Sequence, residues 1–191
     1  MSRSLDPRMS LFALVLWIMS AGLAPSSAKA DAHKDLVGDF ENRVNQYLAV
    51  KKQASGSPHG QTTSAAKLQD SREQNRAKLQ AARSAVKQGD IFSPRIAAYF
   101  RRQIGHALRG HQGSRVKASL VHAEPINGIV LKVNEPYPDG VALQSMPPTL
   151  LLKLPRLPQE LQYRIVGRSL VLLDVEPNLV VDVLPDAIPA T

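Results

Sequence analysis

The chain has no cysteine among its 191 residues, so neither a disulfide nor a thiolate nucleophile can be part of it. No cysteine follows the apolar run near the N-terminus, which excludes a lipid-anchored lipoprotein of the usual kind. The G-x-S-x-G elbow, the Gly-rich phosphate-binding loop and the H-E-x-x-H zinc motif are missing as well. A protein without disulfides depends on its hydrophobic core alone unless it oligomerises, and the sequence leaves the oligomeric state open.

Residues 1–30 have the three parts of a secretory signal peptide. Two arginines make a positive start, the run 9–23 is almost wholly apolar, and Pro25 precedes an A-x-A cleavage site that ends at Ala30. The apolar run is shorter than the about 20 residues that a membrane span needs. We therefore expect cleavage after Ala30 rather than an uncleaved anchor. The expected product is periplasmic or secreted, most naturally in a bacterial envelope, and has no transmembrane span.

Charge divides the remainder into two regions. Residues 31–122 carry 16 Lys and Arg against 7 Asp and Glu, whereas residues 123–191 carry 5 against 8. The basic region could face anionic lipid, an anionic polymer or nucleic acid, or it could attract the acidic region. Export makes nucleic acid the poorest of these partners, and we do not expect it.

The spacing of apolar residues predicts helices before residue 123. Leu36, Phe40 and Val44 recur at helical spacing in 31–53, while the Ala- and Lys-rich stretch 64–88 has only a thin apolar stripe. Ser93-Pro94 is a helix start, because a capping hydroxyl precedes a proline at the first helical position. We expect helices over 94–109 and 114–123 as well. Whether 64–88 packs on the rest stays open.

After Pro125 the pattern becomes that of short strands between turns. The segments 129–133, 141–144, 149–154, 163–166, 169–173 and 179–184 are predicted strands. Gly167-Arg168 predicts a two-residue type II′ hairpin turn, and Glu176-Pro177-Asn178 predicts a second turn. Asp174 and Asp182 are expected at solvent-facing or edge positions. The predicted fold class is α+β, with a basic helical N-terminal half (31–122) followed by a small antiparallel β-meander of about five strands (123–191).

The run AVKQGDIFSPRIAAYFRRQI (85–104), joined to the tail 147–189, resembles a group of uncharacterised exported bacterial proteins. This resemblance covers most of the chain after residue 30 and implies no activity. The tail alone also resembles a meander that closes several small periplasmic proteins, some associated with metal or stress homeostasis. The matching residues are Tyr163, Arg164, Gly167, Val171, Leu172 and Asp174. The chain departs from that pattern by one residue in the middle spacing and by lacking a cluster of metal ligands nearby.

One predicted helix carries a candidate anion-binding site. Within 94–109, Arg95, Arg102, His106 and Arg109 fall in one narrow stripe opposite the apolar face, at about 100° per residue. A row of guanidinium groups can hold phosphates or carboxylates. The alternative is the ordinary solvated face of an amphipathic helix.

These observations favour an exported, non-enzymatic binding or accessory protein that engages an anionic envelope surface or another envelope protein. The first alternative is an enzyme whose site is assembled only by the fold. The second is a periplasmic metal-binding protein that uses scattered histidines, although none of the five forms a metal-ligand motif. We expect no catalytic residue, metal ligand or cofactor.

Overall fold

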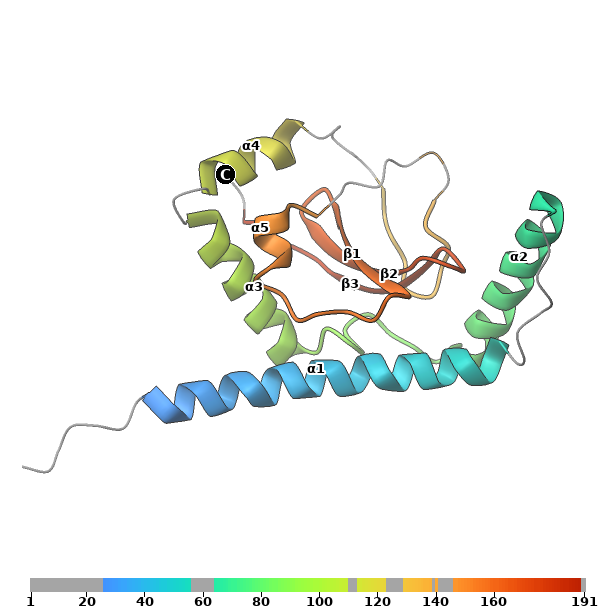
Figure 1. Cartoon of the computed structure of the whole chain (residues 1–191), viewed down its shortest axis with the longest axis horizontal. Coiled ribbons are helices and arrows are strands. Elements are labelled where there is room, and N and C mark those ends of the chain that lie inside the picture. The colour runs from blue at the N-terminus through green and yellow to red at the C-terminus, as the bar shows by residue number, and fades with distance from the viewer. Residues whose placement is uncertain are drawn as a thin grey trace, which may run out of the picture.

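The computed structural model describes residues 26–55, 64–109, 113–122, 129–138, 140 and 146–189 (Figure 1). Five helices and three strands occur in this part of the chain, with all long helices before residue 123 and all strands after it. The α+β fold class is therefore confirmed. The elements are α1 (Ser26–Ser55), α2 (Ala65–Ala82), α3 (Pro94–Arg109), α4 (Gly113–His122), α5 (Pro148–Leu151), β1 (Leu161–Val166), β2 (Ser169–Asp174) and β3 (Leu179–Leu184).

The sheet is the expected meander, with strand order β1-β2-β3 and both pairs antiparallel. Gly167 opens the first hairpin turn with φ 58, while Arg168 keeps a negative φ, as a type II′ turn requires. Asn178 has φ 51 in the second turn. The β2–β3 register shifts between Leu172 and Leu173, which marks a β-bulge beside Asp182.

The main core lies between the sheet and the helices α1 and α3. Phe40 from α1, Phe100 from α3 and Tyr163 from β1 meet there, with ring centroids 5.1–6.4 Å apart. Leu79 of α2 is buried in the same cluster, so the helix that sequence left unplaced docks on the rest of the molecule. The core therefore crosses residue 122, the boundary between the basic region and the strand module.

Segment 129–138 covers the opposite face of the sheet, where Tyr137 and the half-buried Leu131 and Val133 pack on β2 and β3. The prediction of a strand over 129–133 is wrong, because this segment runs beside β3 with a single bridge, from Pro136 to Leu179. A continuous ladder is blocked since Asn134 has φ 66 and the prolines at 136 and 138 lack an N–H.

The predicted strand over 149–154 is also wrong, because residues 148–151 form the short helix α5. Pro148 stands at a first helical position, where a proline favours helix over strand. The predicted strand over 141–144 lies outside the described residues. The described part of the meander therefore has three strands rather than about five.

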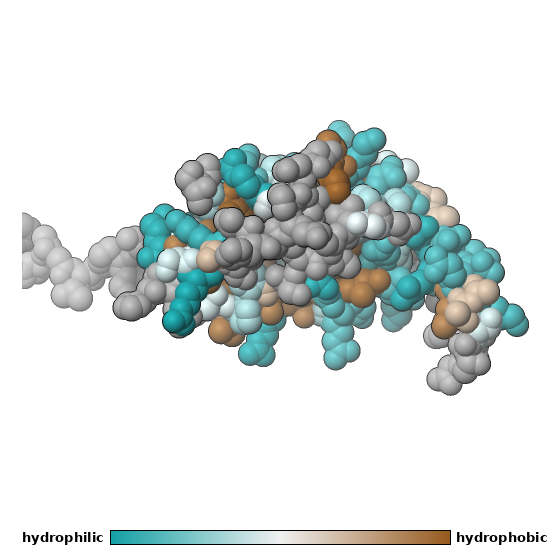
Figure 2. All heavy atoms as spheres, turned by 90° about the horizontal axis from the view of Figure 1, so that it is seen from above, coloured by the Kyte–Doolittle hydropathy of each residue, from teal (hydrophilic) through white to brown (hydrophobic). Residues whose placement is uncertain are grey.

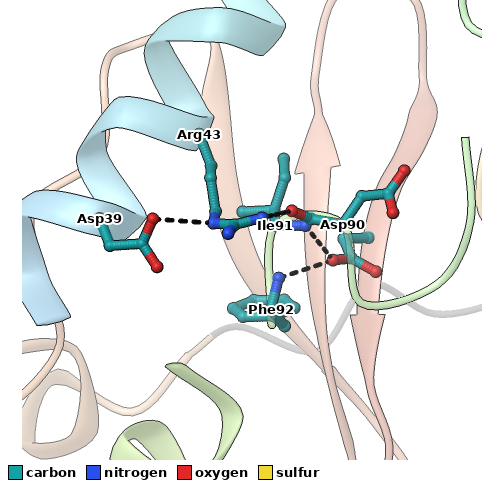
Figure 3. A network of polar contacts seen from close by, with 6 residues as sticks. Asp39, Arg43, Asp90, Ile91 and Phe92 are labelled. Atoms are coloured by element: carbon teal, nitrogen blue, oxygen red, sulfur yellow. Dashed lines mark hydrogen bonds and ion pairs between the residues drawn. The ribbon is translucent and has the colours of Figure 1, made fainter. Parts of the chain in front are cut away.

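Helix α2 ends at Ala82 rather than near residue 88, and the chain then turns into α3. Asp182 holds this turn, because its carboxylate accepts hydrogen bonds from the backbone N–H groups of Gly89, Ile91 and Phe92 at 2.7–2.9 Å. Arg43 of α1 reaches the same turn and donates to the Asp90 carbonyl at 2.6 Å (Figure 3). Asp182 lies on the edge strand β3, and an edge is one of its two expected positions, but it is fully buried, so the solvent-facing alternative is wrong.

Candidate anionic-surface site

Helix α3 begins and packs as its sequence predicts. Pro94 is its first residue, and the Ala97 N–H donates to the Ser93 carbonyl at 2.7 Å. Ile96, Phe100, Ile104 and Leu108 are buried on the face that meets the core. The orientation of α3 is therefore fixed by its apolar side, which determines the side that solvent meets.

The opposite side of α3 presents the four residues of the candidate site. Arg95, Arg102, His106 and Arg109 are all exposed, and we call them the basic stripe. On an α-helix these positions fall within about 60° around the axis and span about 21 Å along it. The structure thus brings the four together as one straight row, which is the arrangement expected from the sequence.

No acidic side chain neutralises the basic stripe within the part of the chain that the structure describes. The ion pairs in this described part involve Arg43 and Lys51 of α1 and Arg168 of the turn between β1 and β2, and none involves a residue of α3. The sequence from 91 to 122 holds six Lys and Arg and no Asp or Glu. An uncompensated row of this kind produces a positive potential that attracts polyanions.

The first turn of α3 strengthens this asymmetry. It contains Arg95 and no acidic residue, although the positive end of the helix dipole would be stabilised by a carboxylate there. A cation in the first turn is unfavourable for helix stability by a few tenths of a kcal/mol, on the order of the usual dipole effect. Its placement therefore adds positive potential rather than stability.

Two arginines of α3 are partly fixed by neighbours. The Arg102 guanidinium lies 5.8 Å from the ring centroid of Tyr99, and the centroid of the His33 ring lies 5.1 Å from that of Tyr99. Arg101 leaves the stripe to one side and donates to the Pro185 carbonyl at 2.8 Å, which ties α3 to the C-terminal segment. Burial raises the pKa of Tyr99, with Arg102 opposing that shift, so the ring under the guanidinium stays neutral.

A second polar cluster, which the sequence did not predict, joins α1 to the end of β2. Asp174 is fully buried and accepts hydrogen bonds from the Tyr47 hydroxyl at 2.6 Å and from Lys51 Nζ at 2.9 Å. Lys51 also pairs with the exposed Glu176 at 3.1 Å, and the Arg83 guanidinium lies 4.8 Å from the Tyr47 ring centroid. Asp174 lies on the central strand β2 and is buried, so its predicted solvent-facing or edge position is wrong.

Burial controls the protonation of this cluster. It raises the pKa of Tyr47, and the negative charge of Asp174 adds to that shift. Burial opposes the charged form of Lys51, but the bonds to Asp174 and Glu176 outweigh it and raise the pKa of the amine. Burial likewise raises the pKa of Asp174, partly offset by its hydrogen bonds. Asp174 and Tyr47 are closed to solvent, so we assign the cluster to holding α1 on the sheet.

A shallow pocket of about 280 Å³ lies between α1 and the proline-rich segment before β1. Phe40, Val44 and Leu157 make its floor, and Glu41 and Arg156 stand at the surface. The described groups with a raised pKa are Tyr47, Lys51 and Asp174 of the buried cluster and Tyr99, Tyr137 and Tyr163 elsewhere, and none of them lines this pocket. An enzyme site combines a pocket with such groups, so the enzyme alternative gains no support from this pocket.

The histidines do not converge on a metal in the described residues, where no group of three or more His, Asp and Glu side chains could hold an ion. His33 lies beside Tyr99 and His106 lies on the basic stripe. His59, His111 and the side chain of His122 lie outside the described residues. In the same described part, no helix is long and apolar enough to cross a membrane.

Comparison of the chain with protein-family models, with curated proteins and with solved structures found no match. The functional argument therefore rests on the geometry of this molecule alone.

Proposed function

We propose that this is an exported, non-enzymatic protein of a bacterial envelope, and that the basic stripe of α3 binds an anionic surface there that presents phosphate or carboxylate groups. One observation carries the proposal: the four side chains of the stripe form an exposed row about 21 Å long without an acidic partner among the described residues. Arginine suits phosphate because its planar guanidinium can donate two parallel hydrogen bonds to one group.

Export supports the choice of partner. A signal peptide over 1–30 would deliver the protein to a compartment where lipid headgroups and cell-wall polymers supply the accessible phosphates and carboxylates. Removal of residues 1–30 would spare the core that the structure describes, since residues 31–35 are exposed and the first side chain of α1 described as buried is Phe40. The chain 31–191 therefore contains every described core residue and is suitable for experiments.

The size of the expected effect follows from the charges. A basic residue near an anionic membrane surface contributes about 1 kcal/mol at physiological salt. Changing Arg95, Arg102 and Arg109 together to Ala should thus weaken binding by about 3 kcal/mol, or about a hundredfold. The interaction should also weaken steeply with salt, because the screening length falls from about 10 Å at 0.1 M to about 3 Å at 1 M.

The experiment is co-sedimentation of 31–191 with phosphatidylglycerol-containing vesicles, with neutral phosphatidylcholine vesicles and with isolated peptidoglycan, at two salt concentrations. The proposal expects binding to an anionic surface that is lost at high salt and in the triple variant. Absence of binding to every anionic surface at low salt would contradict it, and the stripe would then be an ordinary solvated helix face.

A further inference from the structure

Helix α5 presents apolar side chains to solvent in an unusual way. Leu150 is fully buried and Leu154 is buried, which fixes both ends of the short apolar run. Between them, Leu151 is 48% exposed and Leu152 is 83% exposed. Prolines at 147, 148 and 155 bracket the run and restrict its backbone. The two leucines are thus held outward by a rigid, anchored turn, and we call them the leucine tip.

The leucine tip differs from the other exposed apolar residues of the described chain. The remaining large ones are Leu68, Val130 and Val175, which are far apart in the sequence, whereas the tip is a pair of neighbours. On the face drawn in Figure 2, hydrophobic residues reach the surface in small, separate patches among hydrophilic ones. A protruding aliphatic pair contributes favourable free energy only where its side chains can leave water.

Positive charge follows the tip in the sequence. Lys153 and Arg156 follow it and are exposed, and the sequence from 141 to 159 contains no Asp or Glu. Helix α5 packs against α3, so the tip and the basic stripe lie on neighbouring elements at one end of the molecule (Figure 1). Helix α2 lies at the opposite end.

We propose that the anionic surface is a lipid bilayer and that the leucine tip inserts into it while arginines and lysines hold the phosphates. This inference rests on the proposed function and names its ligand. Proteins that lie in the membrane interface place basic side chains at the level of the lipid phosphates and aliphatic side chains deeper, among the acyl chains. A polysaccharide or another hydrated polymer would bind the charges and leave the leucines in water.

The test uses tryptophan fluorescence, because the only tryptophan of the chain is Trp17 and 31–191 therefore has none. Leu152→Trp places a reporter on the tip. Leu68→Trp is the matched control, since Leu68 is also exposed, at 49%, and lies on the distant α2. Each variant is mixed with phosphatidylglycerol vesicles, with and without lipids brominated in the acyl chains.

The proposal expects a blue-shifted emission and quenching by the brominated lipids for Leu152→Trp and neither change for Leu68→Trp. It also expects the double variant Leu151→Ser/Leu152→Ser to bind vesicles about tenfold or more weakly, because the favourable free energy of moving two leucine side chains from water into the bilayer is lost. Far-ultraviolet circular dichroism of this exposed double variant verifies its fold.

Three results would overturn the inference, and they are distinguishable. If vesicles bind in a salt-sensitive way while the indole at position 152 stays in water, the stripe binds phosphate but the tip does not insert, and the proposed function survives. If no vesicle binds and peptidoglycan does, the partner is a polymer and the bilayer assignment fails alone. If nothing anionic binds, both the inference and the proposed function fail.

Discussion

The buried pair of Lys51 and Asp174 allows the sharpest test of how the fold is held together. Lys51→Ala would leave the fully buried Asp174 carboxylate with the Tyr47 hydroxyl as its remaining side-chain donor. Removing one partner of a buried ion pair costs about 3–5 kcal/mol, because the other charge stays out of water without compensation. For a domain of this size, that loss corresponds to a fall in Tm of about 6–20 °C.

The assay is urea unfolding of 31–191, followed by circular dichroism and analysed for both midpoint and slope. Lys52→Ala is the matched control, since Lys52 is the next residue on α1 and is exposed. The control should change the free energy of unfolding by less than about 0.5 kcal/mol. Replacing both partners, with Lys51→Met and Asp174→Leu, should restore part of the stability, because no buried charge is left unpaired. A loss below about 1 kcal/mol in Lys51→Ala would refute the reasoning.

Three further predictions follow from other contacts. Asp182→Asn should cost about 2–4 kcal/mol in urea unfolding, because the amide NH₂ of the new side chain would face backbone N–H groups that now donate hydrogen bonds to the carboxylate. The exposed Asp186→Asn is the control, and an equally small loss in both variants would contradict this prediction. Gly113→Ala should cost about 1–3 kcal/mol of stability, because the added Cβ would lie 2.0 Å from the Leu108 carbonyl oxygen. Hydrogen exchange should show weaker amide protection in α4, and unchanged exchange would contradict this prediction. The pKa of Lys51 is raised in the folded state, so its contribution to stability is present below the ordinary lysine pKa of about 10.4 and is lost as pH rises through the folded-state pKa. The free energy of unfolding measured from pH 9 to 12 should therefore fall less in Lys51→Met than in the wild type.

The parts of the fold that sequence predicted are those with local signals. Helix α3 has Ser93-Pro94 at its start and an apolar face at regular spacing, and both signals lie within the helix itself. The β1–β2 hairpin depends on Gly167, whose positive φ the turn requires. The solvent-facing position of the basic stripe follows from the same helical period, so this candidate site was predictable in its geometry.

The parts that sequence missed depend on distant partners. A short apolar run such as 150–152 suits a buried strand or a helix equally, and its neighbours in space decide between them. The burial of Asp174 and Asp182 could not be predicted because their partners lie about a hundred residues away, such as Lys51 and Phe92. A lysine four residues after Tyr47 on the apolar side of α1 was the only local hint of the buried cluster.

The central claim is that α3 binds an anionic surface through its row of arginines, and one comparison tests it most directly. The affinity of 31–191 for phosphatidylglycerol vesicles is measured for two triple variants of equal net charge. The first changes Arg95, Arg102 and Arg109 to Ala, and the second changes the exposed Lys67, Arg72 and Lys78 of α2 to Ala. We predict about a hundredfold weaker binding for the first and a change of less than about tenfold for the second. Equal losses in the two variants would show that net charge alone attracts the surface, and would contradict a site on α3.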